Sequence, residues 1–174
     1  RIQTMYDYIN IILVVVATII NSIVFGYVAS NSKRNKANQA YLIFLSFIIL
    51  YTIFDCIIIQ VFNSIETKDI IVKLQATLWM PLAILFLNFI YIFLRKQKDE
   101  IFKIFIISTI VSIFFTLFSD KVLLGYKNFN LGTAGTTGPF FLPVLFLGIM
   151  PPAVYALFLI IIEGKIFYIS KKNT

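Results

Sequence analysis

Asp55 is the only acidic residue in the central part of any long uncharged segment of the chain. A charge at that depth in a membrane costs roughly 2.5–3.5 kcal/mol on insertion scales, so such groups usually face the interior of a helix bundle. Tyr51 lies one helical turn away, and Gln75 and Trp79 on the next segment are expected at a similar depth, with Lys73 as a counter-ion. We interpret Asp55, Tyr51, Gln75 and Trp79 as candidates for ligand binding or gating in an outward-opening pocket. The alternative is that Asp55 only fixes helix packing and Trp79 is an interfacial anchor.

The chain lacks the residues that most catalytic mechanisms require. It has no His and a single Cys, Cys56, which excludes imidazole ligands, His general bases and an internal disulfide. Because there are no paired carboxylates and no Ser/His arrangement, we expect no enzyme activity, no metal and no cofactor. A single acidic residue within the membrane also gives little support for an ion-coupled pump, which usually needs a chain of ionisable groups across the membrane. The basic loops are short and lack interleaved aromatic residues, so the net charge of +7 does not indicate a nucleic-acid partner.

The composition predicts that these residues are positioned by membrane-spanning helices. The chain is 60% hydrophobic and only 13% charged, whereas soluble domains carry about 25% charged residues. The uncharged run from Leu74 to Leu94 would be about 30 Å long as a helix, which matches the hydrocarbon core of a bilayer. We therefore predict an all-α, polytopic transmembrane bundle formed by one domain over residues 1–174, as part of a longer protein. Its five spans are expected at 8–30, 40–62, 74–94, 101–118 and 140–162.

The distribution of basic residues predicts the orientation of these spans. Segments 31–39, 95–103 and 163–174 hold three, four and three Lys or Arg residues, against one, two and two in the amino-terminal segment and in 63–73 and 119–138. Basic residues concentrate in cytoplasmic loops, so the amino end is predicted outside and the carboxyl end inside the cytoplasmic membrane. The Gly-rich segment 119–138 is then expected as a flexible external lid.

Small and polar residues at helical spacing predict where the helices pack and bend. Two stripes with a spacing of four residues favour close helix approach: Ser22, Gly26 and Ser30 in the first span, and Ser108, Ser112 and Thr116 in the fourth. Asn88 and Tyr91 are expected to form hydrogen bonds between helices. Because proline removes a backbone donor, Pro81, Pro151 and Pro152 are predicted hinges.

Four motifs together resemble a known family. They are NKANQAY at 35–41, the pair Tyr51 and Asp55, the series Pro81, Phe86, Phe89 and Tyr91, and GPFF at 138–141. This arrangement is similar to the seven-helix membrane sensor region at the amino end of bacterial histidine kinases, over about residues 10–170. The chain departs from that pattern, since it has five expected helices and no kinase portion.

The resemblance implies a receptor of a two-component signalling system. It would detect an external or membrane-borne signal, with a small molecule or a lipid as ligand, and pass it by helix movement to a cytoplasmic output module. The full-length protein would be a homodimer in the lipid membrane. One alternative is the substrate-binding or permease subunit of a small-molecule transporter, although the first span lacks the Ala-x-x-x-Ala docking pattern of vitamin importers. The other alternative is a structural or assembly factor without a ligand.

Overall fold

The computed structural model describes the backbone of residues 2–31, 35–60, 65–129 and 132–172, and side chains at 12–30, 35–54, 70, 72–123 and 137–163. In chain order the elements are α1 (Ile2–Asn31), α2 (Lys36–Gln60), α3 (Ile65–Trp79), α4 (Pro81–Phe93), α5 (Glu100–Phe118), β1 (Leu123–Phe129), β2 (Gly132–Thr137), α6 (Phe141–Gly148) and α7 (Met150–Lys172).

The described residues contain five helical segments that are long and apolar enough to cross a membrane: Ile12–Ser30, Lys36–Phe54, Val72–Phe93, Glu100–Phe118 and Phe141–Glu163. The predicted all-α bundle of five spans is therefore confirmed. The second helix begins at Lys36, earlier than the expected residue 40. Its start is stabilised by Asn35, whose Oδ1 atom accepts a hydrogen bond from the Ala37 amide at 2.9 Å.

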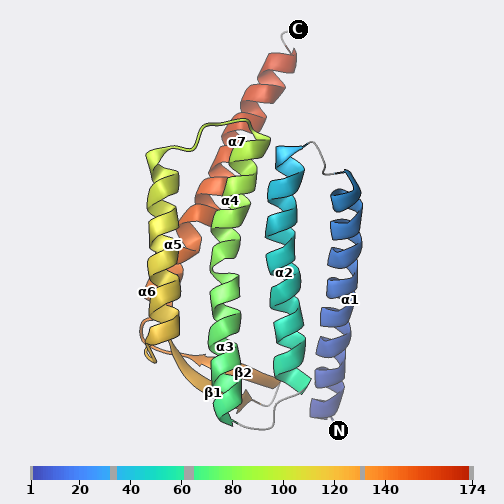
Figure 1. The fold of residues 1–174 in the computed structure, drawn as a ribbon, viewed down its shortest axis with the longest axis vertical. Helices are drawn as coiled ribbons and strands as arrows, with labels where there is room; N and C mark the ends of the chain where they lie inside the picture. Colours follow the sequence, from blue (N-terminus) through green and yellow to red (C-terminus); the bar gives the residue numbers. More distant parts are fainter. Residues whose placement is uncertain (1, 32–34, 61–64, 130–131, 173–174) are drawn as a thin grey trace.

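The helices run alternately in opposite directions, with α1 at one edge of the bundle (Figure 1). α1 packs against α2, α2 against α4, α4 against α7, and α5 against α6. The start of α2, residues 94–99 and the end of α7 lie at one end of the bundle, which we call the 94–99 end. The start of α1, the start of α3 and the β-strands lie at the other end, which we call the hairpin end.

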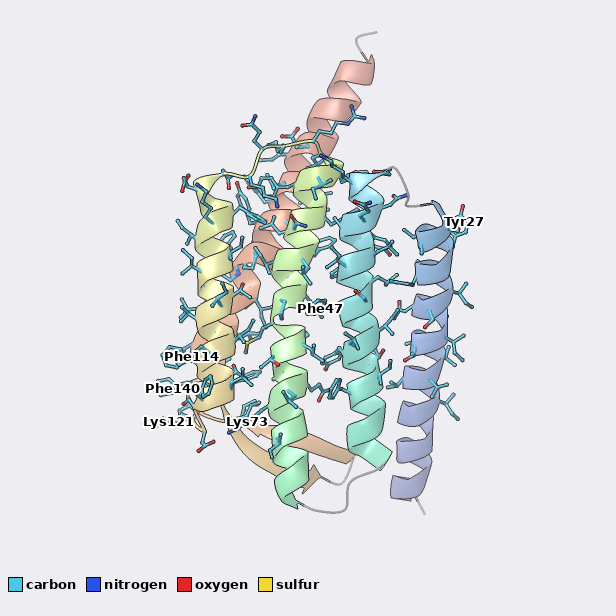
Figure 2. All side chains as sticks on the ribbon, viewed as in Figure 1. Tyr27, Phe47, Lys73, Phe114, Lys121 and Phe140 are labelled. Carbon is cyan, nitrogen blue, oxygen red and sulfur yellow. The ribbon has the colours of Figure 1, made fainter. Side chains whose placement is uncertain are left out.

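The outer surface of the bundle is apolar. Tyr27 on α1 and Phe114 on α5 point away from the other helices (Figure 2), and their exposed fractions are 73% and 59%. Two apolar clusters fill the interior. Near the hairpin end the buried members are Val72, Met80, Val122, Leu123 and Val144. Toward the 94–99 end they are Leu87, Ile90, Tyr91, Phe102, Ala156 and Leu159.

The segment predicted as a flexible lid contains an antiparallel β-hairpin. β1 pairs with β2, with Leu123 opposite Thr137 and Phe129 opposite Gly132, and the register shifts between Leu123 and Tyr126. β1 contacts α3 and β2 contacts α1, so the hairpin extends across the end of the bundle (Figure 1). The pairing itself was not predicted: Thr and Gly residues of β2 form an antiparallel ladder of paired backbone groups with β1.

Candidate functional site

The last span is broken at Ile149, between α6 and α7, and its unpaired carbonyls are satisfied by α5. Pro151 and Pro152 have no N–H groups, so they cannot donate to the carbonyls four residues earlier, those of Leu147 and Gly148. The hydroxyl of Ser108 donates to the Leu147 carbonyl. The adjacent hydroxyl of Thr109 donates to the Gly148 carbonyl at 3.2 Å.

These two hydroxyls therefore replace the helical donors that the prolines remove. Backbone polar groups at membrane depth have no water to bond with, and protein groups must satisfy them. The predicted hinge at Pro151 and Pro152 corresponds to this break. The break precedes the two prolines because both fit the first turn of α7, where backbone donors have no intrahelical partner.

Close contact between α5 and α6 depends on Gly148. A Cβ atom built on Gly148 would lie 2.5 Å from Oγ and 2.7 Å from Cβ of Ser112. Ser112 is 2% exposed and Thr109 is 3% exposed. The hydroxyl-bearing face of α5 therefore packs directly on the backbone of the broken helix, as small residues do at tight helix contacts in membranes.

A second break in the helical hydrogen-bond ladder, between α3 and α4, meets the same face of α5. α3 ends at Trp79 and α4 begins at Pro81, whose missing N–H leaves the Thr77 carbonyl without its helical donor. Met80 lies between the two helices and is 3% exposed. The Thr116 hydroxyl reaches its Sδ atom at 3.5 Å and also donates to the Ser112 carbonyl at 2.9 Å. Met80 keeps helical dihedral angles (φ −59°, ψ −43°) and its amide donates to the Ala76 carbonyl at 3.2 Å, so the span continues through the predicted hinge at Pro81 with one backbone bond missing.

One polar stripe on α5 contacts both proline-interrupted spans. It is formed by Ser108, Thr109, Ser112 and Thr116. Its hydroxyl groups are neutral hydrogen-bond donors, which suits them to holding backbone carbonyls in place. A movement of either span would change which carbonyls they reach. The stripe therefore bonds the backbone of the last span to α5, and none of its members is ionisable at neutral pH.

The residues of the predicted outward pocket lie on two neighbouring helices at the hairpin end. Tyr51 is on α2, and Gln75 and Trp79 are on α3, which packs against α2. All three side chains are half-buried. Asp55 follows Tyr51 by one turn of α2, but its side chain lies outside the described residues.

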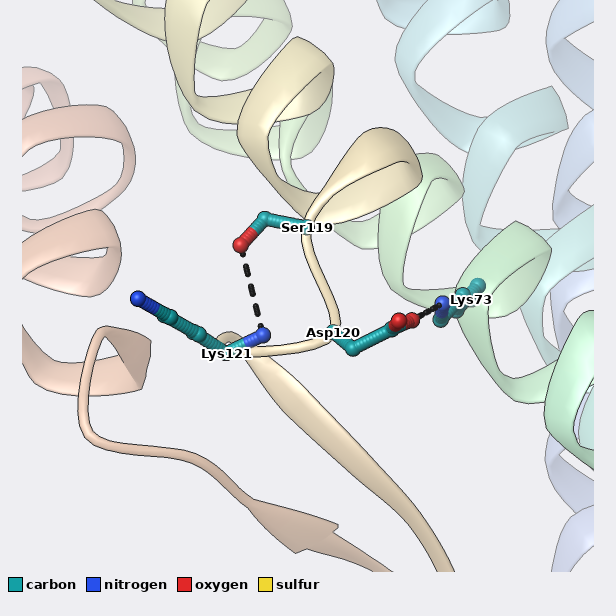
Figure 3. A network of polar contacts seen from close by, with 4 residues as sticks. All are labelled: Lys73, Ser119, Asp120 and Lys121. Atoms are coloured by element: carbon teal, nitrogen blue, oxygen red, sulfur yellow. Dashed lines mark hydrogen bonds and ion pairs between the residues drawn. The ribbon is translucent and has the colours of Figure 1, made fainter.

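Among the described side chains, Lys73 pairs with a residue that the sequence did not suggest. Its ammonium group forms an ion pair with the carboxylate of Asp120, just after α5 (Figure 3). The hydrogen bond from Lys73 and its positive charge lower the pKa of the Asp120 carboxyl below its usual value. Asp120 was overlooked because it is distant from Lys73 in sequence, whereas Asp55 shares the expected depth. The predicted contact between Lys73 and Asp55 stays a prediction, because the Asp55 side chain lies outside the described residues.

The base of the hairpin is closed by backbone contacts around Gly138. The Gly138 amide donates to the Val122 carbonyl at 2.8 Å, and the Phe140 amide donates to the Lys121 carbonyl at 3.1 Å. A Cβ atom on Gly138 would overlap the Lys121 carbonyl. The Lys121 amide in turn donates to the Ser119 hydroxyl at 3.2 Å (Figure 3). Only glycine fits this position, which explains its place in the GPFF motif.

At the 94–99 end, Asp99 connects α5 to α7. Its Oδ1 atom caps α5 by accepting from the Phe102 amide at 2.9 Å, and its Oδ2 atom accepts from the Tyr155 hydroxyl of α7 at 3.0 Å. Nearby, Lys96 and Glu163 form an ion pair at 2.5 Å. Tyr155 and Glu163 thus attach α7 to the segment that joins α4 to α5.

The environment of Asp99 favours its ionised form. Burial by itself would raise the pKa of this carboxyl. The neighbouring Tyr91 hydroxyl, the Phe102 amide and the Tyr155 hydroxyl outweigh that effect, so the net pKa lies below the usual value. The Tyr91 hydroxyl is near the carboxylate but makes no well-directed hydrogen bond within the described residues.

The packing residues predicted from sequence have different outcomes. Ser108, Ser112 and Thr116 lie in the polar stripe described above. Ser22, Gly26 and Ser30 are exposed on α1, and a Cβ atom on Gly26 would meet nothing within 4 Å among the described residues. Among the described residues, this stripe therefore makes no close helix contact of the predicted kind. The face of α1 that packs against α2 is a different one.

The two residues predicted to hydrogen-bond between helices differ in burial. Tyr91 is 1% exposed and packs through its ring, with an edge-on contact to Phe102 at 5.3 Å between centroids. Its predicted interhelical hydrogen bond is absent within the described residues. Asn88 is half-buried on α4.

Sequence reasoning missed Thr109 and Asp99. Thr109 is adjacent to the predicted stripe, and a search for hydroxyl residues able to satisfy proline-freed carbonyls would have included it. Asp99 precedes Glu100 and a long apolar run, which is the pattern of a helix amino-terminal cap.

Comparison of the chain with protein-family models, curated proteins and solved structures finds no match. The class is therefore defined by the fold alone. The chain is a multi-pass helical membrane protein in which prolines interrupt the hydrogen-bond ladder of two spans, and both interruptions meet one polar face of α5.

Proposed function

We propose that the chain is a membrane-embedded sensory domain that relays an external or membrane-borne signal by helix movement to a cytoplasmic output module. The observation that supports this proposal is the meeting of two helix breaks, at Met80 and Ile149, on one polar face of α5. Broken helices supply discrete hinges, and a ligand that binds one arrangement better than another shifts the population toward it.

The candidate input lies next to the first break. Trp79 is the last residue of α3, and Met80 beside it contacts Thr116 of α5. A ligand held by Tyr51, Asp55, Gln75 and Trp79 would therefore act directly on the joint between α3 and α4. The second break transmits the change to α7, which leaves the bundle at the 94–99 end.

The distribution of Lys and Arg favours placing the 94–99 end in the cytoplasm and the hairpin end outside. The protein would then belong to the cytoplasmic membrane of a bacterium, with its carboxyl end inside. As the resemblance to histidine-kinase sensor regions implies, the full-length protein would act as a homodimer.

A transport subunit is the second candidate. The observation in its favour is the pair of breaks in the helical hydrogen-bond ladder. Transporters place substrates beside discontinuous helices whose ends expose backbone groups. In this chain the Leu147 and Gly148 carbonyls are already bonded to α5 hydroxyls. That favours a hinge over an ion-binding site.

The test substitutes the hinge prolines in the full-length protein and measures output, for example autophosphorylation. Pro81→Ala and Pro151→Ala restore backbone donors and should shift the basal output. Pro143→Ala is the matched control, because Pro143 is exposed in the first turn of α6, away from either break. Unchanged output in both hinge variants, or loss of solute uptake in cells that carry them, would favour the transport alternative.

Coding sequence beyond Thr174 supplies a further check. Two more spans followed by a kinase or cyclase domain would support the sensor, and transporter ATPase genes next to a chain that stops there would contradict it. The orientation is tested separately by labelling cysteines placed at Lys98 and Lys121 in a Cys56→Ser background with an impermeant reagent. Reaction at position 98 without reaction at position 121 would reverse it.

A further inference from the structure

A surface cavity of about 400 Å³ lies at the 94–99 end, where α2 begins and α4 ends. It is lined by Asn35, Lys36, Ala37, Ile92, Phe93 and Arg95. The candidate input residues are at the opposite end of the bundle, so this cavity is separate from the site of the proposed function.

Two uncompensated positive charges face the cavity. Lys36 and Arg95 are both exposed, and neither forms an ion pair with any residue that the structure describes. Two nearby lysines do form ion pairs, Lys96 with Glu163 and Lys103 with Glu100. The two lining cations therefore favour an anionic group in the cavity.

The backbone at the end of α4 fixes the position of Arg95. Its φ angle is 54°, in the left-handed region where glycine is the usual residue. Its amide donates to the Ile92 carbonyl at 3.1 Å, and the Lys96 amide donates to the Tyr91 carbonyl at 2.9 Å. These two bonds form a Schellman motif, in which an arginine takes the position beyond the helix end that glycine fills most easily.

The remaining wall of the cavity is apolar and continues toward the membrane. Phe93 is 63% exposed and is the last residue of its span. Its ring lies 5.7 Å from that of Phe89, which lies 5.3 Å from the ring of Tyr41 on α2. An aromatic row thus joins the two helices beneath the charged rim.

We propose that this cavity binds the phosphate headgroup of an anionic phospholipid. Arg95 and Lys36 contact the phosphate, since guanidinium groups recognise its oxygens in a bidentate manner. An acyl chain follows the exposed ring of Phe93 into the bilayer. A free phosphate ion would use the charges but leave the apolar wall unoccupied, which favours the lipid. Basic pockets between helices at the membrane surface bind such headgroups in general. The proposal holds whichever end of the bundle is cytoplasmic and does not depend on signalling.

The test uses the purified chain in neutral detergent. Native mass spectrometry measures bound dioleoylphosphatidylglycerol against dioleoylphosphatidylcholine, and glycerol 3-phosphate without acyl chains serves as the third arm. Binding of the anionic lipid in preference to the other two compounds is the expected result. Equal binding of both lipids would overturn the proposal. Binding of glycerol 3-phosphate as tight as that of the anionic lipid would also overturn it and would assign the site to a soluble phosphate ligand.

Three variants separate the site from general surface charge. Lys36→Gln and Arg95→Gly should each weaken binding of the anionic lipid about fivefold, equivalent to about 1 kcal/mol for one basic residue near an anionic surface. Arg95→Gly suits the left-handed backbone, so its fold should be kept while binding is lost. Lys98→Gln is the matched control, because Lys98 lies over the Phe102 ring and does not line the cavity. An equal loss in Lys98→Gln, or full binding by Arg95→Gly, would refute the assignment.

Discussion

Gly148→Ala should destabilise the bundle by separating α5 from α6. The new Cβ atom would lie 2.5 Å from Oγ of Ser112, about 0.9 Å short of an ordinary contact in a closely packed interior. Overpacking of this kind typically costs about 1–3 kcal/mol. The hydrogen bonds from Ser108 and Thr109 cross the same contact and would lengthen as the helices move apart. We therefore expect a loss near the upper part of that range, about 2–3 kcal/mol.

Gly26→Ala is the matched control for this prediction. Gly26 is also a helical glycine within a span, but a Cβ atom there meets no described atom within 4 Å. Alanine is favoured over glycine inside a helix by roughly 0.5–1 kcal/mol, so this variant should be as stable as the parent chain or slightly more stable. Unfolding of both variants in mixed detergent micelles, followed by helical circular dichroism, measures the difference.

A second substitution at Ser112 tests whether the clash is the cause. Ser112→Ala removes Oγ but leaves Cβ, which the Gly148→Ala side chain would meet at 2.7 Å, so it should rescue only partly. Ser112→Gly removes both atoms and should abolish the penalty. The coupling free energy in this double-mutant cycle should be about 1–3 kcal/mol. Equal stability of Gly148→Ala and Gly26→Ala, or no rescue by Ser112→Gly, would refute the reasoning.

Three further predictions concern the polar contacts that hold the bundle. Ser108→Ala should cost about 1–3 kcal/mol because it leaves the Leu147 carbonyl, which lies within a membrane span, without a donor. Pro151→Ala restores the helical N–H and should reduce that cost in the double variant. Tyr155→Phe should lose about 1.5 kcal/mol with the hydrogen bond to ionised Asp99, the lower end of the range because Asp99 is exposed. Tyr91→Phe should lose less, because its hydroxyl favours ionised Asp99 without a well-directed hydrogen bond; equal losses in detergent unfolding would contradict the assignment of partners. The pKa of Asp99 is lower in the folded state than in the unfolded chain, where it is about 4. Ionised Asp99 therefore stabilises the fold fully above about pH 4, and this contribution is lost as the pH falls through the folded-state pKa. Asp99→Asn should flatten the acid limb of a stability–pH profile.

Local features of the sequence were sufficient to predict the spans. A helix satisfies its own backbone groups, so an uncharged run of sufficient length predicts a spanning helix without knowledge of its neighbours. The prolines predicted breaks for the same reason, since each removes a donor wherever the helix packs. The spacing of Ser108, Ser112 and Thr116 placed three hydroxyl groups on one face of α5.

The partners of those groups could not be read from the chain. Ser108 and Leu147 are 39 residues apart, and the choice of the α6 carbonyls depends on how the two spans are placed. Lys73 pairs with Asp120 across 47 residues, although Asp55 was nearer in expected depth. The left-handed Arg95 and the cavity beside it likewise depend on the ends of two helices coming together.

The sequence by itself therefore determined the number of spans, the positions of the prolines that interrupt them and the hydroxyl stripe on α5. Only the tertiary structure decided that the stripe on α1 faces outward while the stripe on α5 is buried. Both stripes contain small residues at the same spacing. Lipid is as apolar as the interior of the bundle, so hydrophobicity does not distinguish a helix face that meets protein from one that meets the membrane. That choice is made by shape and by hydrogen bonds, which exist only after the helices have packed.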